Sequence, residues 1–514
     1  MSKILPLYKE GVNWTEKPSK SAVIKQKWRD FVENSTLHGM HCIISSQTTF
    51  RRIIWTLILL VGVGYFSYQS SVLLTKYLSF RVTTKTTLVF EQEPEFPAVT
   101  ICNFNMLRKS LVEKHNFTEI TDQVLMSKAG EKINDTTDWG RYKDLDVFEI
   151  YLKAGHGIQD MLFDCSWKGE RCGHQNFTPI LTTMGLCHTF NSGKITIATH
   201  TFSTNAFQES RTAFFKRKQC SSLYGARFVI TIQSRPKIAG KDGRQILTVN
   251  HAGAKFGLNL KLNIQQFDYY GSWTSQAGLK VLIHHHETPP TVEELGFSLA
   301  PGTSTLAAIR KEKVHNLRHP YETNCSDHAI EHLPGYSKYT TPACMLACHS
   351  KYLVEKCGCR DVRILAETNA EVCGIHKMAT CLFREYEDFY KVFGERCKCP
   401  VPCEITSFKA VLSYAAFPSH IFLEEMIRVN VKNATEEEIK DFISMVSGNF
   451  LELNVHFQDL NMFVLEQQPA YSKESLLGEI GGQLGLCIGA SILTILEFCD
   501  VIFTILKIRF GRAG

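Results

Sequence analysis

The sequence predicts a membrane protein of the α+β class, in which two transmembrane helices flank one large, disulfide-rich extracellular domain. Three observations support this prediction. An uncharged run of 23 residues covers 53–75, a second long apolar run covers 480–506, and fifteen of the 18 cysteines lie between the two runs. Because disulfides persist in oxidising compartments, a cysteine-dense segment between two spans is expected outside the cell.

The two apolar runs also predict the topology. About 20 residues suffice to cross the hydrocarbon core, so each run is long enough. Residues 1–52 contain nine Lys or Arg against four acids and no apolar run typical of a signal peptide, and 507–514 contain three Arg or Lys. By the positive-inside rule, both ends are expected in the cytoplasm, with the chain in the plasma membrane. The predicted regions are a cytoplasmic N-terminal region (1–52), transmembrane helix 1 (53–75), an extracellular domain (76–477), transmembrane helix 2 (478–506) and a cytoplasmic tail (507–514).

Composition excludes several other classes of protein. Hydrophobic residues make up 44% of the chain and charged residues 21%, as in an ordinary folded protein. The formal net charge of +6 is mild, and no concentrated basic stripe predicts nucleic-acid binding. No H-E-x-x-H or G-x-S-x-G motif occurs, so we expect neither an enzyme nor a cofactor.

Alternating and β-rich runs predict a sheet assembled from distant parts of the chain. The expected strands cover 96–103, 228–232, 257–264, 279–283 and 450–457. Helical spacing covers 422–429 and 436–446, and polar, helical or irregular insertions are expected over 105–180, 195–250 and 336–403. The run His284-His285-His286 follows an apolar strand, and we interpret it as a solvated strand end rather than a metal site.

The densest cysteine block covers 344–403. Its spacing lacks the paired C-x2-C knuckles of common zinc folds, so disulfides and no metal are expected. Cys344 and Cys348 are one helical turn apart, so both can point at one neighbour, such as the Cys397 and Cys399 pair. Glycosylation sequons occur in the same predicted extracellular domain at Asn116, Asn134, Asn176, Asn324 and Asn433.

Two carboxylates interrupt the second apolar run. Glu497 and Asp500 are three residues apart, hence on one helical face near the cytoplasmic end. In a symmetric oligomer they would form acidic rings that attract cations. The alternative is that both only reach toward the membrane interface.

Small residues in the same run favour the pore. Gly481, Gly485 and Gly489 recur every four residues and can let helices approach closely. Gly489-Ala490-Ser491 can break the helix and turn carbonyl and hydroxyl oxygens toward a water path. Helix packing without a pore remains possible from the glycines alone. The combination with the acidic pair favours a cation pore.

Several runs resemble the degenerin, epithelial sodium channel and acid-sensing ion channel superfamily, over nearly the whole chain. They are Ser35–Gly39, Phe96–Asn103, Gly185–Asn191, Leu295–Phe297 with Ala300–Gly302, the cysteine block, and Leu476–Leu486 leading into Gly489–Ser491. The resemblance implies a homotrimeric, sodium-selective channel blocked by amiloride-type compounds. Its extracellular domain would have palm, finger, thumb, knuckle and β-ball regions.

The resemblance also implies roles for single residues. His38-Gly39 matches the cytoplasmic gating motif, and Gly489-Ala490-Ser491 matches the selectivity filter. Gly478 matches the position where bulky residues hold such channels open, Glu479 lies where a relative has an Asp near the extracellular gate, and Gly482 belongs to the same gate. The implied disulfides are Cys102–Cys187, Cys165–Cys172, Cys325–Cys403, Cys344–Cys399, Cys348–Cys397, Cys357–Cys381 and Cys359–Cys373, which leaves Cys220 without a family partner.

The stimulus is suggested by departures from the proton-gated relatives. Residues 82–90 contain neither His nor acid, and Phe267 and Phe383 stand at acidic-pocket positions, although Asp268 and Glu387 remain. Protonation of clustered acids would be the pH switch in those relatives.

The run Pro320–Cys325 is more similar to invertebrate FMRFamide-type peptide-gated sodium channels than to the acid-sensing branch. We therefore expect an extracellular amidated neuropeptide to open a sodium channel in the lipid bilayer. The alternatives are a proton-gated, constitutive or bile-acid-type channel of the same superfamily and, in another class, a non-conducting two-anchor receptor or adhesion protein.

Overall fold

The structure is a computed structural model that describes residues 20–34, 40–121, 139–142, 145–193, 246–271, 275–327, 333, 336, 338–365, 369–430 and 435–510. The chain forms two compact units. We call residues 1–83, 320–322 and 468–514 the helical unit, and residues 84–319 and 323–467 the sheet unit.

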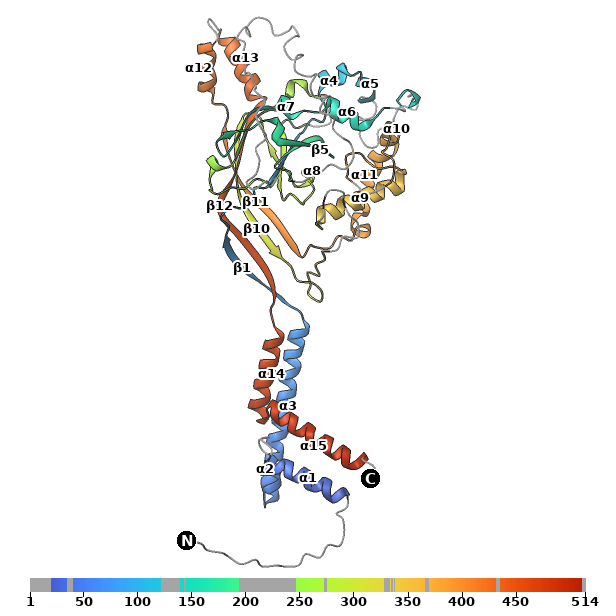
Figure 1. Cartoon of the computed structure of the whole chain (residues 1–514), viewed down its shortest axis with the longest axis vertical. Helices are drawn as coiled ribbons and strands as arrows, with labels where there is room; N and C mark the ends of the chain where they lie inside the picture. Colours follow the sequence, from blue (N-terminus) through green and yellow to red (C-terminus); the bar gives the residue numbers. More distant parts are fainter. Residues whose placement is uncertain are drawn as a thin grey trace, which may run out of the picture. The chain divides into compact units, whose positions relative to one another are not determined.

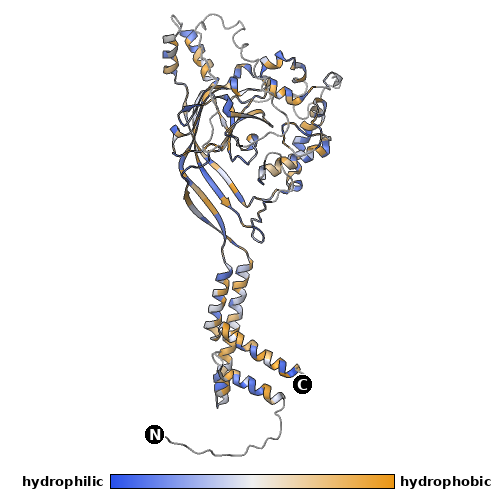
Figure 2. Ribbon diagram, viewed as in Figure 1, coloured by the Kyte–Doolittle hydropathy of each residue, from blue (hydrophilic) through white to orange (hydrophobic). Residues whose placement is uncertain are grey.

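The helical unit contains two long apolar segments (Figure 1). Helix α3 (Thr49–Leu78) is long and apolar enough to cross a membrane by itself. Helices α14 (Lys473–Ile488) and α15 (Ile492–Phe510) pass the same test only together, and they are bent by 75° at the break between them. Figure 2 shows α15 as largely apolar. Most large apolar side chains of α3 and α15 are exposed in the single chain, as expected of surfaces that face lipid or other copies.

Two shorter helices complete the described part of this unit. Helix α1 covers Lys20–Asn34 and α2 covers Met40–Ser45. The rings of Trp28 and Phe31 in α1 contact the ring of Phe498 in α15, with centroids 6.2 and 5.9 Å apart. The predicted cytoplasmic segment is therefore packed against the second apolar segment.

The sheet unit is built on two sheets. The larger has the strand order β11-β10-β12-β7-β3-β4, and β1 also pairs with β12. Its strands are β1 (Val82–Phe90), β3 (Leu162–Trp167), β4 (Glu170–Arg171), β7 (Leu258–Asn263), β10 (Thr303–His315), β11 (Glu404–Ala416) and β12 (Phe450–Pro469). The parallel pairing of β10 with β12 joins segments that are about 150 residues apart. This long-range pairing confirms a sheet assembled from distant parts of the chain.

The smaller sheet has the order β5-β6-β2-β8-β9. Its strands are β2 (Ala98–Asn103), β5 (Phe177–Thr182), β6 (Gly185–Phe190), β8 (Leu279–His284) and β9 (Phe297–Leu299). One apolar core contains residues of both sheets. In this core the ring of Phe96 packs edge-on against those of Trp167 and Phe457, with centroids 4.6 and 6.2 Å apart.

Helices lie above these sheets and along one side of them in Figure 1. Helices α4 (Lys109–Lys114), α5 (Thr118–Ile120), α6 (Val147–Ala154) and α7 (Ile158–Met161) follow β2, and α8 (Val292–Leu295) follows β8. Helices α4 to α6 share a second core with the cysteine-rich lobe, which contains α9 (Thr341–Cys357), α10 (Ile375–Lys377), a π-helical turn (Met378–Leu382) and α11 (Phe383–Arg396). Helices α12 (His420–Asn430) and α13 (Glu436–Ser447) pack on each other around a separate small core.

Most predicted elements are present. The strands expected over 96–103, 257–264, 279–283 and 450–457 correspond to β2, β7, β8 and β12, and the helices expected over 422–429 and 436–446 correspond to α12 and α13. The strand expected over 228–232 lies outside the described residues. The description of 105–180 as a polar, helical or irregular insertion is wrong in part, because β3, β4 and β5 lie there. These strands are short and only partly buried, so their alternation is weak.

Seven disulfides connect the sheet unit. They join Cys102–Cys187, Cys165–Cys172, Cys325–Cys403, Cys344–Cys399, Cys348–Cys397, Cys357–Cys381 and Cys359–Cys373. These are the seven pairs that the family resemblance implies. Four of them lie inside the cysteine-rich lobe, where α9 presents Cys344 and Cys348 to the segment that follows α11. Cys220 lies outside the described residues.

Close contact between α3 and α14 depends on Gly62. A Cβ atom at Gly62 would lie 2.7 Å from the carbonyl oxygen of Cys487, whereas a Cβ at Gly64 meets nothing within 4 Å. We therefore expect Gly62→Leu to destabilise the packing of the two helices by about 1–3 kcal/mol. Thermal unfolding of the full chain in detergent should show a lower Tm for Gly62→Leu and little change for the matched control Gly64→Leu. Equal Tm values for the two variants would contradict this assignment.

Candidate pore segment and gating network

The break between α14 and α15 lies at Gly489-Ala490-Ser491, where the sequence predicts it. Gly489 is left-handed (φ 69°, ψ 18°) and its N–H donates to the Gly485 carbonyl, which ends α14. A residue with a Cβ adopts this conformation only at a cost, so glycine suits the position. The last carbonyls of a helix have no partner within that helix. The break therefore leaves backbone oxygens of 486–488 free of helical hydrogen bonds.

Ser491 begins the next helix. Its Oγ accepts the N–H of Thr494 at 3.3 Å, and the Thr494 Oγ1 accepts the N–H of Ser491 at 3.1 Å. The two side chains thus cap α15 reciprocally. Backbone of this kind is tolerated at membrane depth only where protein or water satisfies it. Hence the geometry suits a constriction that offers oxygen atoms to a cation.

The acidic pair lies beyond the break, in α15. Glu497 and Asp500 are both exposed in the single chain. In the sequence they flank Phe498, whose ring contacts Trp28 of α1. Neither carboxylate has a hydrogen bond or an ion pair to other described residues. Unpaired carboxylates in an apolar helix are costly unless they face water or a neighbouring copy.

The predicted gate residues lie along α14. Gly478, Glu479 and Gly482 are all exposed in the single chain, and a Cβ at either glycine would meet nothing within 4 Å. A Cβ at Gly478 is therefore free of close contacts with the described part of the chain.

The predicted glycine ladder does not make the contact within the chain. A Cβ at Gly481 would meet nothing within 4 Å, and one at Gly485 would just touch the Ala490 carbonyl oxygen at 4.0 Å. Within the described chain the close contact between α3 and α14 is made at Gly62 instead. The close approach predicted at Gly481, Gly485 and Gly489 for helices of neighbouring copies stays a prediction. Their face of α14 carries no close helix neighbour among the described residues.

Some predicted sites fall outside the described residues. His38-Gly39 lies between α1 and α2 in the undescribed stretch 35–39, and the sequon residues Asn134 and Asn433 also lie outside. Asn116 and Asn324 are exposed. The half-buried Asn176 accepts the N–H of Gly173 through its Oδ1 at 3.1 Å. Asn116 and Asn324 are thus the accessible sequon residues within the described part of the chain.

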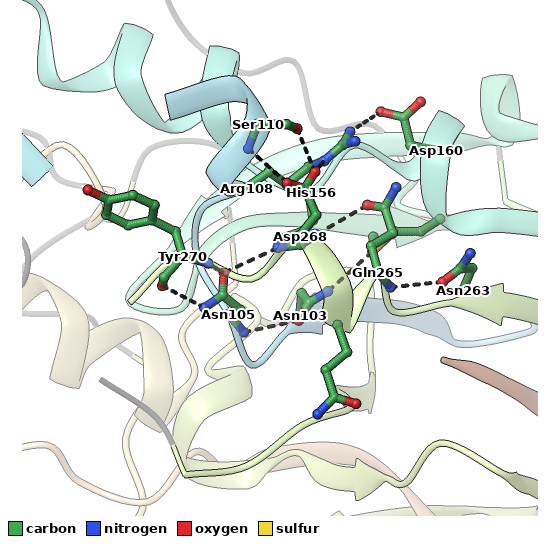
Figure 3. Close-up of polar contacts among 12 residues, drawn as sticks. Asn103, Asn105, Arg108, Ser110, His156, Asp160, Asn263, Gln265, Asp268 and Tyr270 are labelled. Atoms are coloured by element: carbon green, nitrogen blue, oxygen red, sulfur yellow. Dashed lines mark hydrogen bonds and ion pairs between the residues drawn. The ribbon is translucent and has the colours of Figure 1, made fainter. Parts of the chain in front are cut away.

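A buried polar network lies where the chain leaves β2 for α4 (Figure 3). Arg108 donates from Nε to Asp268 at 2.8 Å and from Nη1 to Asp160 at 2.6 Å, and only 4% of its side chain is exposed. Asp268 also accepts from the N–H and the hydroxyl of Ser110, at 2.8 and 2.6 Å. Asp268, which the sequence left as a candidate proton sensor, is therefore fully occupied as an ion-pair partner.

Amide side chains extend the network toward the sheets (Figure 3). Asn105 accepts the N–H of Tyr270 and donates to its carbonyl, while Asn103 donates to the Ile264 carbonyl at 2.9 Å. His156 lies 3.2 Å from the Oε1 of Gln265 through its Nδ1. Sequence reasoning missed this network, because its members are separated by up to about 160 residues and no local motif marks them.

Three buried histidines of the sheet unit have a lowered pKa. Desolvation lowers the pKa of His156 to about 3 and that of His188 and His349 to about 4. These imidazoles are therefore neutral from pH 7.4 down to about pH 5, and they do not change charge in that range.

His284 and His286 are buried and His285 is half-buried, so the interpretation of this run as a solvated strand end is wrong. His284 and His286 are 7% and 6% exposed. His284 donates from Nδ1 to the His285 carbonyl at 3.0 Å, and its Nε2 accepts from the Thr100 hydroxyl at 2.8 Å. The run is covered because β8 lies inside the smaller sheet, next to β2.

The structure also shows the surroundings of the other three positions that match the acidic pocket of proton-gated relatives, Phe267, Phe383 and Glu387. Phe267 is 60% exposed and Glu387 is also exposed. Phe383 is half-buried, and its ring centroid lies 6.0 Å from the guanidinium carbon of Arg363. Arg363 in turn forms a buried ion pair with Asp361 at 2.7 Å. This pair holds the pKa of Asp361 below its usual value despite burial. No clustered carboxylate pair is present among these positions in the described structure.

A long apolar helix, a broken apolar segment with free carboxylates beyond the break, and a disulfide-rich α+β unit define a membrane protein of the ion-channel class. The model of the amiloride-sensitive sodium channel family matches residues 31–501. The chain is 30% identical to acid-sensing ion channel 2 of Homo sapiens, over 96% of this chain and 89% of that protein. It is also 30% identical to acid-sensing ion channel 1C of Danio rerio, over 93% and 83%.

The chain therefore belongs to the amiloride-sensitive sodium channel family. This membership places it among cation channels of the plasma membrane and excludes an enzyme.

Proposed function

We propose that this protein is a homotrimeric, sodium-selective channel that an extracellular amidated neuropeptide opens and amiloride blocks. The observation that carries the pore assignment is the break at Gly489-Ala490-Ser491, with Glu497 and Asp500 beyond it in the same segment. Both termini would be cytoplasmic, and the sheet unit would face the extracellular side. The regions would be those predicted: 1–52, 53–75, 76–477, 478–506 and 507–514.

The pore would work through oxygen atoms and charge. Three copies of the break would bring carbonyl and hydroxyl oxygens of the selectivity filter around one axis, where they replace water around a partly dehydrated cation. Rings of Glu497 and Asp500 would concentrate cations at the cytoplasmic mouth and repel anions. Gly478, Glu479 and Gly482 would form the extracellular gate, and His38-Gly39 would act from the cytoplasmic side.

The choice of a peptide over protons rests on the polar groups of the sheet unit. The buried histidines are neutral above about pH 5, and Asp268 is held by Arg108 and Ser110. A proton step between pH 7.4 and 6 would therefore leave the charge of these histidines unchanged. A peptide, in contrast, opens the pore to the extent that it binds the open state better than the closed state.

The test is a recording of whole-cell current from cells that express the full chain. A panel of amidated peptides and a separate series of pH steps are applied to the wild type and to Ser491→Leu. We expect an amiloride-blocked sodium current in response to at least one peptide and a loss of sodium selectivity or current in Ser491→Leu with surface expression retained. Acid-evoked current with silence to every peptide would overturn the peptide assignment. Absence of any amiloride-blocked current would instead favour the non-conducting receptor.

Proton gating is the second candidate, because the relatives are named acid-sensing ion channels. Glu294 in α8 is the one carboxyl, among those in the described residues, whose pKa is clearly raised, by burial first and then by Glu293. It lies beside Leu346 of α9 in a small cavity and hydrogen-bonds Tyr390 of α11. If the channel does respond to acid, Glu294→Gln is the variant expected to shift that response.

A further inference from the structure

Three potential metal-binding side chains meet at the end of β8. Glu95, His285 and His286 each present a ligand atom, and these three atoms lie within 4.8 Å of one another. Ligand atoms around a tetrahedral Zn²⁺ are about 3.3 Å apart, given metal–ligand distances near 2.0–2.1 Å. Small side-chain rotations would close the remaining gap.

The backbone that carries Glu95 is held on both sides. The Phe96 N–H donates to the Leu247 carbonyl at 2.8 Å, and the Val249 N–H donates to the Pro94 carbonyl at 3.1 Å. The carboxylate itself makes no hydrogen bond or ion pair with other described residues, and its charge only partly opposes the burial that lowers the pKa of His285. A fixed backbone with an unused carboxylate is what a preformed ligand requires.

His286 provides the second, independent observation. Its ring is buried, and its Nδ1 has no hydrogen-bond partner among the described residues. The other nitrogen, Nε2, lies 3.2 Å from Asn191 Nδ2. An unsatisfied buried nitrogen is costly, and a metal ion would satisfy it.

His285 is weakly held and can adjust. It is half-buried, and the hydrogen bond that its Nδ1 accepts from the Glu287 N–H is long, at 3.3 Å. Its ligand atom already lies within 4.8 Å of those of Glu95 and His286.

Nearby cations do not exclude a metal. Lys311 and Lys338 lie close enough to lower the pKa of His285. Each ammonium is already paired, Lys311 with Glu91 at 2.9 Å and Lys338 with Glu404 at 2.9 Å.

We propose that Glu95, His285 and His286 form a binding site for a divalent transition-metal ion, with Zn²⁺ as the best match. Two imidazoles and one carboxylate suit Zn²⁺, Co²⁺, Ni²⁺ or Cu²⁺ and not Ca²⁺ or Mg²⁺, which prefer oxygen ligands alone. Three protein ligands leave a fourth position for water. A bound ion would tie the connection between β1 and β2, which carries Glu95, to the end of β8.

The site is tested on the purified full chain, freed of metal in detergent and titrated with Co²⁺ and then Zn²⁺. Co²⁺ is expected to produce visible absorption bands of a tetrahedral or five-coordinate centre, which Zn²⁺ abolishes by competition. Glu95→Gln and His285→Gln should each weaken this binding at least tenfold. The matched control His251→Gln alters an exposed histidine that stacks on Phe256, and it should bind as the wild type does.

A control for folding keeps the result interpretable. Glu95 and His285 are only half-buried, so both variants are expected to keep the metal-free Tm of the wild type. Zn²⁺ should raise the Tm of the wild type and of His251→Gln, and not that of Glu95→Gln or His285→Gln. Co²⁺ binding that is unchanged in both Glu95→Gln and His285→Gln would overturn the proposal.

Discussion

Arg108→Met is expected to destabilise the sheet unit by about 3–5 kcal/mol. The guanidinium joins Asp160 and Asp268, and its removal leaves the carboxylate of Asp268, whose side chain is 8% exposed, without its cation. Removing one partner of a buried ion pair costs far more than the pair itself contributes, because a buried charge is left uncompensated. Thermal unfolding of the full chain measures this loss.

Two further variants test whether the loss comes from the buried ion pair between Arg108 and Asp268. Arg318 forms an ion pair with Asp327 that is exposed on both sides, so Arg318→Met should cost less than about 1 kcal/mol. The double variant Arg108→Met/Asp268→Asn removes the stranded charge and should recover part of the loss. A Tm for Arg108→Met equal to that of Arg318→Met would refute the central role of this network.

Acid is expected to lower the stability of the sheet unit steeply, without opening the channel. Burial lowers the pKa of His156 to about 3 and that of His188, His284 and His349 to about 4, whereas the unfolded chain has the ordinary value near 6.5. As pH falls below about 6.5, the unfolded chain therefore takes up protons that the folded chain does not. The stability of the folded state is full above about pH 6.5 and is lost progressively toward about pH 4.

The expected loss at pH 5 is up to about 2 kcal/mol for each histidine with a folded-state pKa near 4. Thermal unfolding at pH 7.4 and 5.0 measures the difference in Tm. His188 donates from Nε2 to the His156 carbonyl at 2.9 Å, a bond that the amide of His188→Gln can replace without titrating. This variant should show a shallower dependence on pH. A Tm that does not change between pH 7.4 and 5.0 would disprove the assignment of these histidines as neutral and buried.

Local patterns were sufficient for much of the fold. Periodicity predicts β2, β7, β8, β12, α12 and α13, and the small-residue run at 489–491 predicts the break between α14 and α15. Each of these features depends on residues that are adjacent in the chain. The short strands β3 to β5 were missed, because partial burial weakens their alternation. No strand was predicted over the longer strands β10 and β11 either.

Composition and spacing alone determined that this chain carries two long apolar segments, a cysteine-rich domain between them and a break flanked by carboxylates. Only the tertiary structure decided which side chains are buried together. In the structure the histidine run is not a solvated strand end but lies covered near Glu95. The close contact between α3 and α14 is made at Gly62. Asp268 forms an ion pair with Arg108. The physical reason is that burial, desolvation and ion pairing depend on residues up to about 190 positions apart in the chain. Such neighbours cannot be identified from the local sequence.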